Sequence, residues 1–191
     1  MKKRTPLIII TVAALFAALT AICSWIQIPS VPIPFTMQTF AVFLSVYVLG
    51  IEKSFLSLLV YLLLGAAGLP VFSRFQGGVG VLAGATGGYL IGFLLSVLIT
   101  GALLRLCRNK IVPVFFSMLA GLLICYVFGT GWFIILNNTR FDTTTIWTAL
   151  KGAVLPFIIP DAVKIVIAIL VGRKIKRISD KYLCNNNIGE D

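Results

Sequence analysis

The stretch IVPVFFSMLAGLLICYVFGTGWFIIL (111–136) decides the fold, because it carries no charged side chain over a length that can cross a lipid bilayer. A transmembrane α-helix needs about 20 consecutive, predominantly apolar residues. The rest of the chain is similar: of its 191 residues, 59% are hydrophobic and 12% are charged, and the mean hydropathy is +1.05. A soluble domain carries about 25% charged residues. The sequence therefore predicts an all-α integral membrane protein.

Six apolar runs of comparable composition predict six helical spans within a single membrane domain. Proline and glycine clusters separate the runs, because proline cannot continue a helix and glycine favours turns. The predicted spans are 6–28, 36–49, 54–69, 79–106, 111–136 and 146–172, followed by a basic and then polar tail over 173–191. The second and third spans are short, which is explained either by helices that stop beside an outward-facing cavity or by local thinning of the bilayer.

Cationic residues are concentrated in alternate loops, and this distribution predicts the orientation of the chain. If the N-terminus is cytoplasmic, the cytoplasmic segments hold Lys2, Lys3, Arg4, Lys53, Arg105, Arg108, Lys110, Arg173, Lys174, Lys176, Arg177 and Lys181. The outward-facing loops then hold only Arg74 and Arg140. Short loops rich in Lys and Arg remain on the cytoplasmic side, so both termini are predicted to be cytoplasmic. The net charge of +10 is thereby explained without a nucleic-acid partner.

The residue inventory argues against an enzyme and against a metal or cofactor site. The chain has no histidine, and its cysteines form no CxxC pair, which excludes the usual zinc ligand sets. It also lacks the GxSxG, HExxH and GK[ST] patterns of common hydrolases and phosphate-binding loops. We therefore expect a binding or transport protein that resides in the lipid bilayer and uses no cofactor.

Asp161 and Lys164 are charged residues within the last apolar span. A charge at this depth costs about 3 kcal/mol or more, so it is normally paired or functional. At positions i and i+3, the two side chains lie on one helix face and can meet. They form either a neutralised structural pair or a site for a polar ligand. Pro156 and Pro160 favour the second interpretation, because each removes a backbone donor and opens the helix nearby.

Small residues recur at intervals of four in the first span, at Ala13, Ala17 and Ala21. This spacing places them on one helix face and allows another helix to approach closely. Two interpretations remain open. The face either packs inside the chain or docks a separate membrane subunit.

A glycine ladder with the same spacing occupies the start of the fourth span, at Gly80, Gly84, Gly88 and Gly92. Close helix packing is the ordinary reason for such a ladder. The region also contains Thr86, Gly87 and Tyr89, so it is rich in polar atoms as well as glycine. Backbone amides without side chains around them are accessible to a ligand. The segment is therefore a candidate binding region.

Gln38 lies one turn inside the second span, where its amide needs a hydrogen-bond partner. A neighbouring helix and a ligand are equally good candidates for that partner. Thr36, two residues earlier, is placed to cap the helix.

Four segments in this order, VPIPFTMQTFAVFL (31–44), LGAAGLPVFS (64–73), GGVGVLAGATGGYLIGF (77–93) and PDAVK (160–164), resemble the BioY family. These are small membrane proteins that capture biotin for energy-coupling-factor (ECF) transporters. The resemblance covers nearly the whole chain. It implies a six-helix substrate-binding subunit, or S-component, with biotin held near the outer face. It also implies a membrane-embedded T-component and two cytoplasmic ATPase subunits as partners.

The resemblance assigns roles to individual residues as well. It implies that Ala13, Ala17 and Ala21 form the surface that meets the T-component, and that Asp161 and Lys164 belong to the biotin pocket. With the candidates from the other segments, the predicted substrate-binding residues are Asp161, Lys164, Gln38, Thr36, Phe35, Tyr89, Thr86, Gly87, Gly88 and Arg74.

The chemistry of biotin suits these residue types. Its ureido ring has two N–H donors and a carbonyl acceptor, and its valerate chain ends in a carboxylate. A buried aspartate can accept the ureido N–H groups and a lysine can meet either oxygen function. The alternatives are an S-component for another vitamin, a secondary carrier coupled to protons through Asp161, and an intramembrane enzyme that uses Asp161 and Lys164. The carrier and the enzyme are weakened because no second acidic residue lies within a span.

Overall fold

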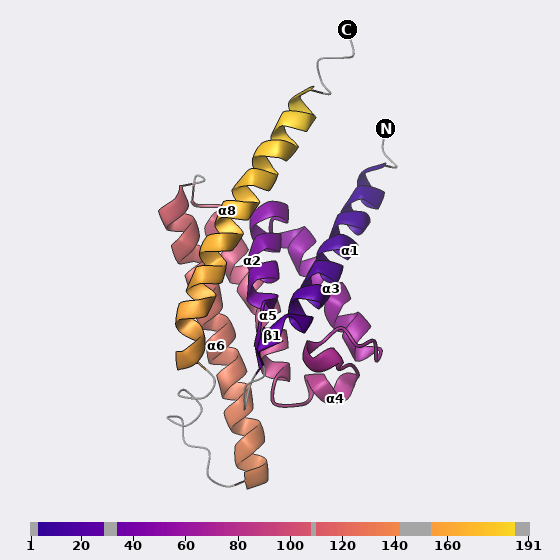
Figure 1. Ribbon diagram of the computed structural model, residues 1–191, viewed down its shortest axis with the longest axis vertical. Coiled ribbons are helices and arrows are strands. Elements are labelled where there is room, and N and C mark those ends of the chain that lie inside the picture. The colour runs from indigo at the N-terminus through magenta and orange to yellow at the C-terminus, as the bar shows by residue number, and fades with distance from the viewer. Residues whose placement is uncertain (1–3, 29–33, 108–109, 142–153, 186–191) are drawn as a thin grey trace.

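The computed structural model describes residues 4–28, 34–107, 110–141 and 154–185, which form a helical bundle (Figure 1). Within these ranges there are seven α-helices: α1 (Arg4–Trp25), α2 (Gln38–Leu49), α3 (Ile51–Ala66), α4 (Val79–Leu82), α5 (Gly87–Leu104), α6 (Ile111–Phe141) and α8 (Leu155–Asn185). Two short antiparallel strands, β1 (Gln27–Ile28) and β2 (Phe35–Thr36), and one 3₁₀ turn, η1 (Ser73–Phe75), complete the described elements. The predicted all-α class is confirmed.

Helix α2 is the most enclosed element, because it packs against α1, α3, α5 and α8. Its side chains from Gln38 to Tyr47 are buried, apart from Phe40, which is partly buried. A helix that is apolar all round needs neighbours on every side. Around it, α1 packs on α3 and α5 packs on α6. The N-terminal end of α2 therefore lies where several helices can contribute side chains to one site.

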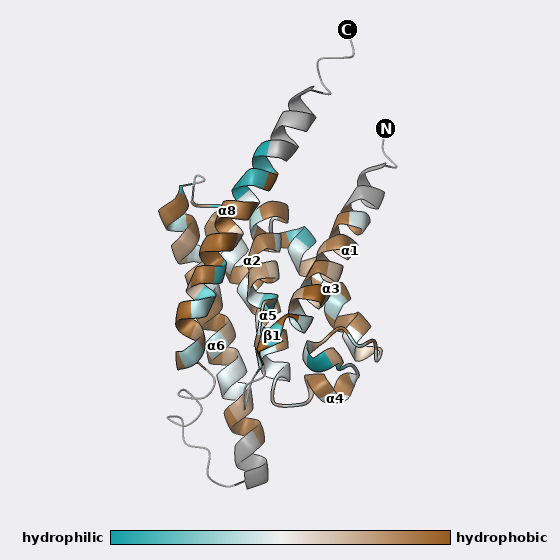
Figure 2. Cartoon of the chain, viewed as in Figure 1, coloured by the Kyte–Doolittle hydropathy of each residue, from teal (hydrophilic) through white to brown (hydrophobic). Residues whose placement is uncertain are grey.

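Within the described part of the chain, three helical segments are long and apolar enough to cross a membrane: α5, α6 over Ile111–Leu136 and α8 over Leu155–Arg177. Two shorter apolar helices accompany them, Ile9–Trp25 and Gln38–Leu49. Many large apolar side chains on the outer faces are exposed, including Leu15, Val127 and Ile159. Apolar surface on this scale calls for lipid rather than water. Figure 2 shows the bundle covered largely by hydrophobic residues, with hydrophilic residues where α8 continues beyond it.

The first span is shorter at its C-terminal end than predicted. Helix α1 ends at Trp25 rather than at Ile28, and Gln27 and Ile28 instead pair with Thr36 and Phe35. The next residue in the sequence is Pro29, which disfavours helical backbone in the residue before it. Strand β2 likewise delays the start of α2 from the predicted residue 36 to Gln38.

The predicted span over 79–106 is two helices instead of one. The short helix α4 ends at Leu82, and α5 begins at Gly87. Between them the chain turns through Gly84, whose carbonyl accepts the Gly87 N–H at 3.1 Å. A side chain at Gly87 would collide with the Leu82 carbonyl, so the turn depends on glycine at that position.

The remaining boundaries differ by several residues. Helix α3 covers Ile51–Ala66 instead of 54–69, and α6 extends to Phe141 instead of 136. Helix α8 begins at Leu155 with Pro156 in its first turn, where a missing backbone N–H costs nothing. It continues through Pro160 and on to Asn185, so residues 173–185, predicted as a tail, are helical. The first part of the predicted span 146–172 lies largely outside the described residues.

Candidate ligand-binding site

Asp161 and Lys164 form a buried ion pair on α8, which confirms that the two side chains meet. Lys164 Nζ is 2.7 Å from Asp161 Oδ1, and Asp161 is 3% and Lys164 4% exposed. An unpaired charge in this environment would be strongly unfavourable, and mutual pairing offsets part of the cost of removing both groups from water.

The carboxylate of Asp161 accepts hydrogen bonds from three helices. Thr39 Oγ1 of α2 donates to Oδ1 at 2.9 Å, and the Tyr126 hydroxyl of α6 donates to Oδ2 at 2.6 Å. Lys164 of α8 supplies the third bond. An ionised carboxylate offers about four acceptor positions. The described residues occupy three of these positions on Asp161, which leaves one acceptor position for a ligand.

Lys164 joins α8 to strand β2. Its ammonium group donates to the Thr36 carbonyl at 2.6 Å and lies 3.6 Å from the centre of the Phe35 ring. Phe35 in turn stacks on Phe157, with ring centres 5.7 Å apart. The ring face attracts the cation. An ammonium has three N–H donors, and Asp161 and Thr36 engage two of them, so one donor remains.

A cavity of about 70 Å³ lies beside this network. Its lining contains six of the residues predicted to bind substrate: Thr36, Gln38, Thr86, Tyr89, Asp161 and Lys164. Residues that are far apart in the sequence, such as Thr36 and Lys164, therefore line the same cavity. Ligand pockets typically measure about 300–1,000 Å³, so a bicyclic ligand must widen this one by moving side chains.

The amide of Gln38 obtains its hydrogen-bond partners from neighbouring residues of the chain. Its Nε2 donates to the Tyr61 hydroxyl at 2.7 Å, and its Oε1 accepts from Thr36 Oγ1 at 3.0 Å. A neighbouring helix thus supplies a partner, while the side chain also lines the cavity. Tyr89 is positioned in a similar way, through a 2.8 Å hydrogen bond with Thr130.

Several lining residues were not predicted from the sequence: Pro34, Thr39, Ser73, Leu90, Phe93, Cys125, Tyr126 and Phe157. Tyr126 and Thr39 matter most, because both bind Asp161 directly. Each is a hydroxyl within an apolar helix, and a buried hydroxyl needs a partner. A hydroxyl group within an apolar helix is therefore a sequence feature that predicts a buried hydrogen bond, although it does not identify the partner.

Four predicted residues do not line the cavity: Phe35, Gly87, Gly88 and Arg74. A Cβ at Gly87 would meet the backbone of Leu82, and one at Gly88 would meet the side chain of Trp132. Both glycines therefore permit close packing of the turn before α5. Phe35 contacts the site through Lys164 rather than through the cavity wall.

Arg74 lies outside this cavity but lines an adjoining one of about 470 Å³. The two cavities share Pro34, Ser73 and Thr86. The two cavities therefore adjoin each other. Arg74 adopts a φ of 59°, a left-handed conformation that is uncommon for residues other than glycine.

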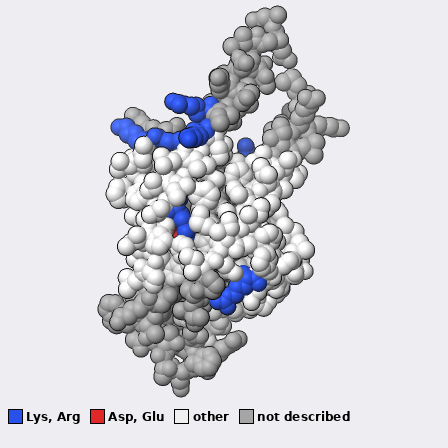
Figure 3. Space-filling view, in the orientation of Figure 1, with Lys and Arg blue, Asp and Glu red and all other residues white. Residues whose placement is uncertain are grey.

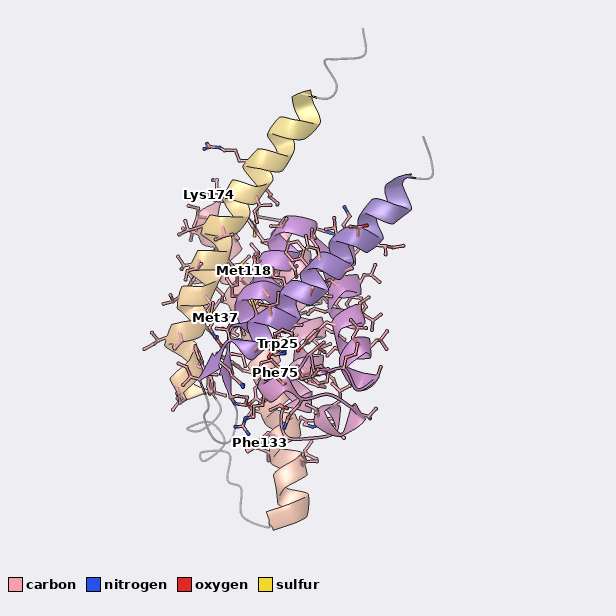
Figure 4. The ribbon with its side chains drawn as sticks, turned by 45° about the vertical axis from the view of Figure 1, so that its right-hand side comes forward. Trp25, Met37, Phe75, Met118, Phe133 and Lys174 are labelled. Atoms are coloured by element: carbon pink, nitrogen blue, oxygen red, sulfur yellow. The ribbon has the colours of Figure 1, made fainter. Side chains whose placement is uncertain are left out.

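The loop that carries Arg74 is attached to the end of α1. The ring of Trp25 stacks on Phe75, with centres 5.1 Å apart; Figure 4 labels the two side chains. Trp25 Nε1 also donates to the Pro70 carbonyl at 2.9 Å, and Ser24 Oγ donates to the Val71 carbonyl at 2.6 Å. These contacts hold the outer wall of the larger cavity in place.

The structure revises the face of α1 that is available to a partner. Ala13, Ala17 and Ala21 are buried, on a helix that packs against α3 and α2. These three alanines therefore serve internal packing, and the docking surface predicted on them is not exposed. Among the alanines of α1, Ala14 and Ala18 are exposed, one position later in the same pattern.

The chain is similar along most of its length to proteins of one family. A model of the BioY family matches residues 1–181. The biotin transporter BioY of Thermotoga maritima is 42% identical over 166 residues, which cover 87% of this chain and 94% of that protein. The biotin transporter BioY2 of Lactococcus lactis subsp. cremoris is 35% identical over 187 residues, which cover 96% of this chain and 100% of that protein.

A solved structure shares the fold. The crystal structure of the S-component for biotin from an ECF-type ABC transporter superposes with a TM-score of 0.81 at 23% sequence identity. The superposition covers 93% of this chain and 95% of that one.

Proposed function

The chain belongs to the BioY family, and from that premise we propose that it is the biotin-binding S-component of an ECF-type ABC transporter. It is a multi-pass cell membrane protein. The observation that carries the proposal is the buried Asp161–Lys164 pair beside a cavity, because each member keeps one hydrogen-bonding position for a ligand. Biotin has both the donors and the acceptors to use these positions.

In the proposed complex, Asp161 accepts from a ureido N–H group and Lys164 donates to an oxygen of biotin. Tyr89 and Phe157 line the cavity and offer apolar surface to the thioether ring. Arg74, in the adjoining cavity, attracts the carboxylate of an approaching biotin. Gly87 and Gly88 contribute through the shape of the turn and not by contact.

We also propose one membrane domain of six spans, formed by α1, α2, α3, α5, α6 and α8, with both termini cytoplasmic. Two observations support this arrangement. The two ends of the described chain lie at the same end of the molecule (Figure 1), as an even number of spans requires. Most of the cationic residues occupy segments that this topology places in the cytoplasm.

Biotin is expected to raise the melting temperature of the purified protein in detergent, because a ligand that binds only the folded state stabilises it by mass action. At about 100 times Kd the stabilisation is about 2.7 kcal/mol. The measurement is a thermal-shift titration with biotin, and riboflavin, thiamine and folate serve as controls. No shift with biotin at high micromolar concentration would refute the ligand, and a shift with another vitamin would change the cargo but keep the class.

The partners in this proposal are a membrane-embedded T-component and two cytoplasmic ATPase subunits, which would hydrolyse the ATP. Ala14 and Ala18 are the surface of α1 on which a partner helix could approach closely, since both are small and exposed.

Ala18→Trp is expected to abolish co-purification with the transporter partners while it preserves the thermal shift with biotin. Ala17→Trp, one residue earlier, is expected to destabilise the chain itself by about 1–3 kcal/mol or more, because Ala17 is buried. Val127→Trp, at an exposed position on α6, is the matched control. Assembly that survives Ala18→Trp would place the partner interface elsewhere.

A further inference from the structure

A third cavity lies at the opposite end of α2 from the biotin site. It measures about 440 Å³ and is lined by the end of α2, the start of α3, the end of α5, and parts of α6 and α8. At 1.5 Å per residue, the twelve residues of α2 separate the two sites by about 18 Å. None of the residues that line this third cavity takes part in the proposed binding of biotin.

The charges of this cavity are unbalanced. Its lining includes three cationic side chains, Lys53, Arg105 and Lys176, and one carboxylate, Glu52. Lys176 Nζ lies 4.5 Å from the centre of the Tyr47 ring. Among the described residues, this cation–π interaction is the only polar or ring interaction of its ammonium group. Neither Lys53 nor Arg105 forms an ion pair or a side-chain hydrogen bond within the part of the chain that the structure describes. Among the described residues, two of the three cations of this cavity therefore have no anionic partner, and the third contacts only an aromatic ring.

The walls beneath these charges are apolar. Val46, Leu49, Leu104 and Val114 line the same space. A site with a cationic rim and an apolar interior suits an amphipathic anion better than a small soluble one. Glu52 makes the site less favourable for an anion, but the net charge of the lining remains positive.

The position of the cavity matches the depth of lipid headgroups. Helix α2 ends at Leu49, α3 begins at Ile51, α5 ends at Leu104 and α6 begins at Ile111, so the cavity lies where the apolar segments stop. Gly50, before α3, provides no side chain to cap the free N–H groups of the first turn. Figure 3 shows Lys and Arg gathered at the end of the molecule from which α8 extends, with few charged atoms across the middle.

We propose that this cavity binds the phosphate of an anionic phospholipid, with Lys53, Arg105 and Lys176 around the headgroup and the acyl chains along the apolar wall. The lipid would hold together the ends of α2, α3, α5 and α8. Basic pockets between transmembrane helices on the cytoplasmic side are suited to acidic headgroups, and cation–phosphate hydrogen bonds are among the stronger ones in proteins.

The test uses full-length protein that has been stripped of lipid in a neutral detergent. Phosphatidylglycerol is titrated by native mass spectrometry and by thermal shift, with phosphatidylcholine of the same acyl chains as the uncharged comparison. We expect phosphatidylglycerol to bind at least about tenfold more tightly than phosphatidylcholine and to raise the melting temperature. Equal binding of the two lipids would overturn the proposal.

Two variants examine the cavity itself. Lys53→Gln/Arg105→Gln changes two exposed side chains and is expected to weaken phosphatidylglycerol binding by about tenfold or more. Lys174→Gln removes one positive charge from an exposed residue of α8 that does not line the cavity, labelled in Figure 4, and should change binding less than about twofold. The thermal shift with biotin shows that each variant is folded. An unchanged lipid affinity in the double variant would refute the site.

Soluble anions separate the lipid from other sources of phosphate. Inorganic phosphate and glycerol phosphate, at the concentrations used for the lipid, are expected to leave the melting temperature unchanged. A shift equal to that of phosphatidylglycerol would instead assign the cavity to a soluble phosphate compound. If the double variant retained lipid binding but lost the transporter partners, the cavity would be a protein interface, and the lipid proposal would be wrong.

Discussion

Asp161→Asn is expected to lower the affinity for biotin by about 10- to 150-fold. The reason is that a hydrogen bond to a charged group contributes about 1.5–3 kcal/mol, which corresponds to this range in Kd. The amide also replaces an acceptor with a donor, so the position left open on Asp161 is no longer suited to a ureido N–H group. Isothermal titration calorimetry in detergent measures the change.

The difficulty in this experiment is stability, because removing one member of a buried ion pair typically costs about 3–5 kcal/mol. The double variant Asp161→Asn/Lys164→Met removes both charges and is expected to recover much of the lost stability while it still binds biotin poorly. Asp180→Asn makes the same chemical change about 28 Å further along α8, at 1.5 Å per residue, and should bind normally. Normal binding by Asp161→Asn would leave the pair with a structural role only.

Gly87→Ala is expected to destabilise the protein by about 1–3 kcal/mol or more, although it adds a single methyl group. The added Cβ would collide with the carbonyl oxygen, the carbonyl carbon and the Cα of Leu82. Backbone atoms cannot rotate aside as a flexible side chain can, so the turn between α4 and α5 would have to move. Thr86 and Tyr89, which line the cavity, would move with it. Biotin affinity should therefore fall together with the melting temperature.

Gly80→Ala is the matched control for this substitution, because it lies in α4 and its Cβ would have no atom within 4 Å. Alanine favours helix over glycine by about 0.8–1 kcal/mol, so this variant should be as stable as the parent or slightly more stable. Equal melting temperatures for Gly87→Ala and the parent protein would show that the turn is not as tight as the structure has it.

The features that the sequence predicts correctly depend only on residues close together in the chain. Long uncharged runs predict helices, and the spacing of Asp161 and Lys164 places both side chains on one helix face regardless of how the bundle packs. The break in the fourth span was missed because an uninterrupted apolar run hides a turn that glycine makes possible. In the first span, Pro29 disfavours helical backbone in the residue before it, and the helix ends at Trp25, earlier than a single proline at position 29 indicates.

The parts that did not follow depend on how helices are rotated against each other. Successive residues of a helix differ by about 100° in direction, at 3.6 residues per turn. Ala13 and Ala14 therefore belong to different faces, and only the packing of α1 on α3 shows which one is covered. Tyr126 was missed for the same reason. Its contact with Asp161 joins helices 35 residues apart in the sequence, a distance over which no pattern in one chain identifies the partner.

The small volume of the cavity beside Lys164 has a kinetic meaning. A space of about 70 Å³ is below the usual range for ligand pockets, so we expect a bicyclic ligand to associate only with those molecules in which lining side chains such as Phe157 and Lys164 have shifted. The observed affinity is then the intrinsic affinity multiplied by the population of the open form. Association is slowed by the same factor, while side chains that pack against the bound ligand must move again before it leaves, which lengthens its residence time. Tight capture from dilute solution would then be achieved through slow release rather than through fast encounter.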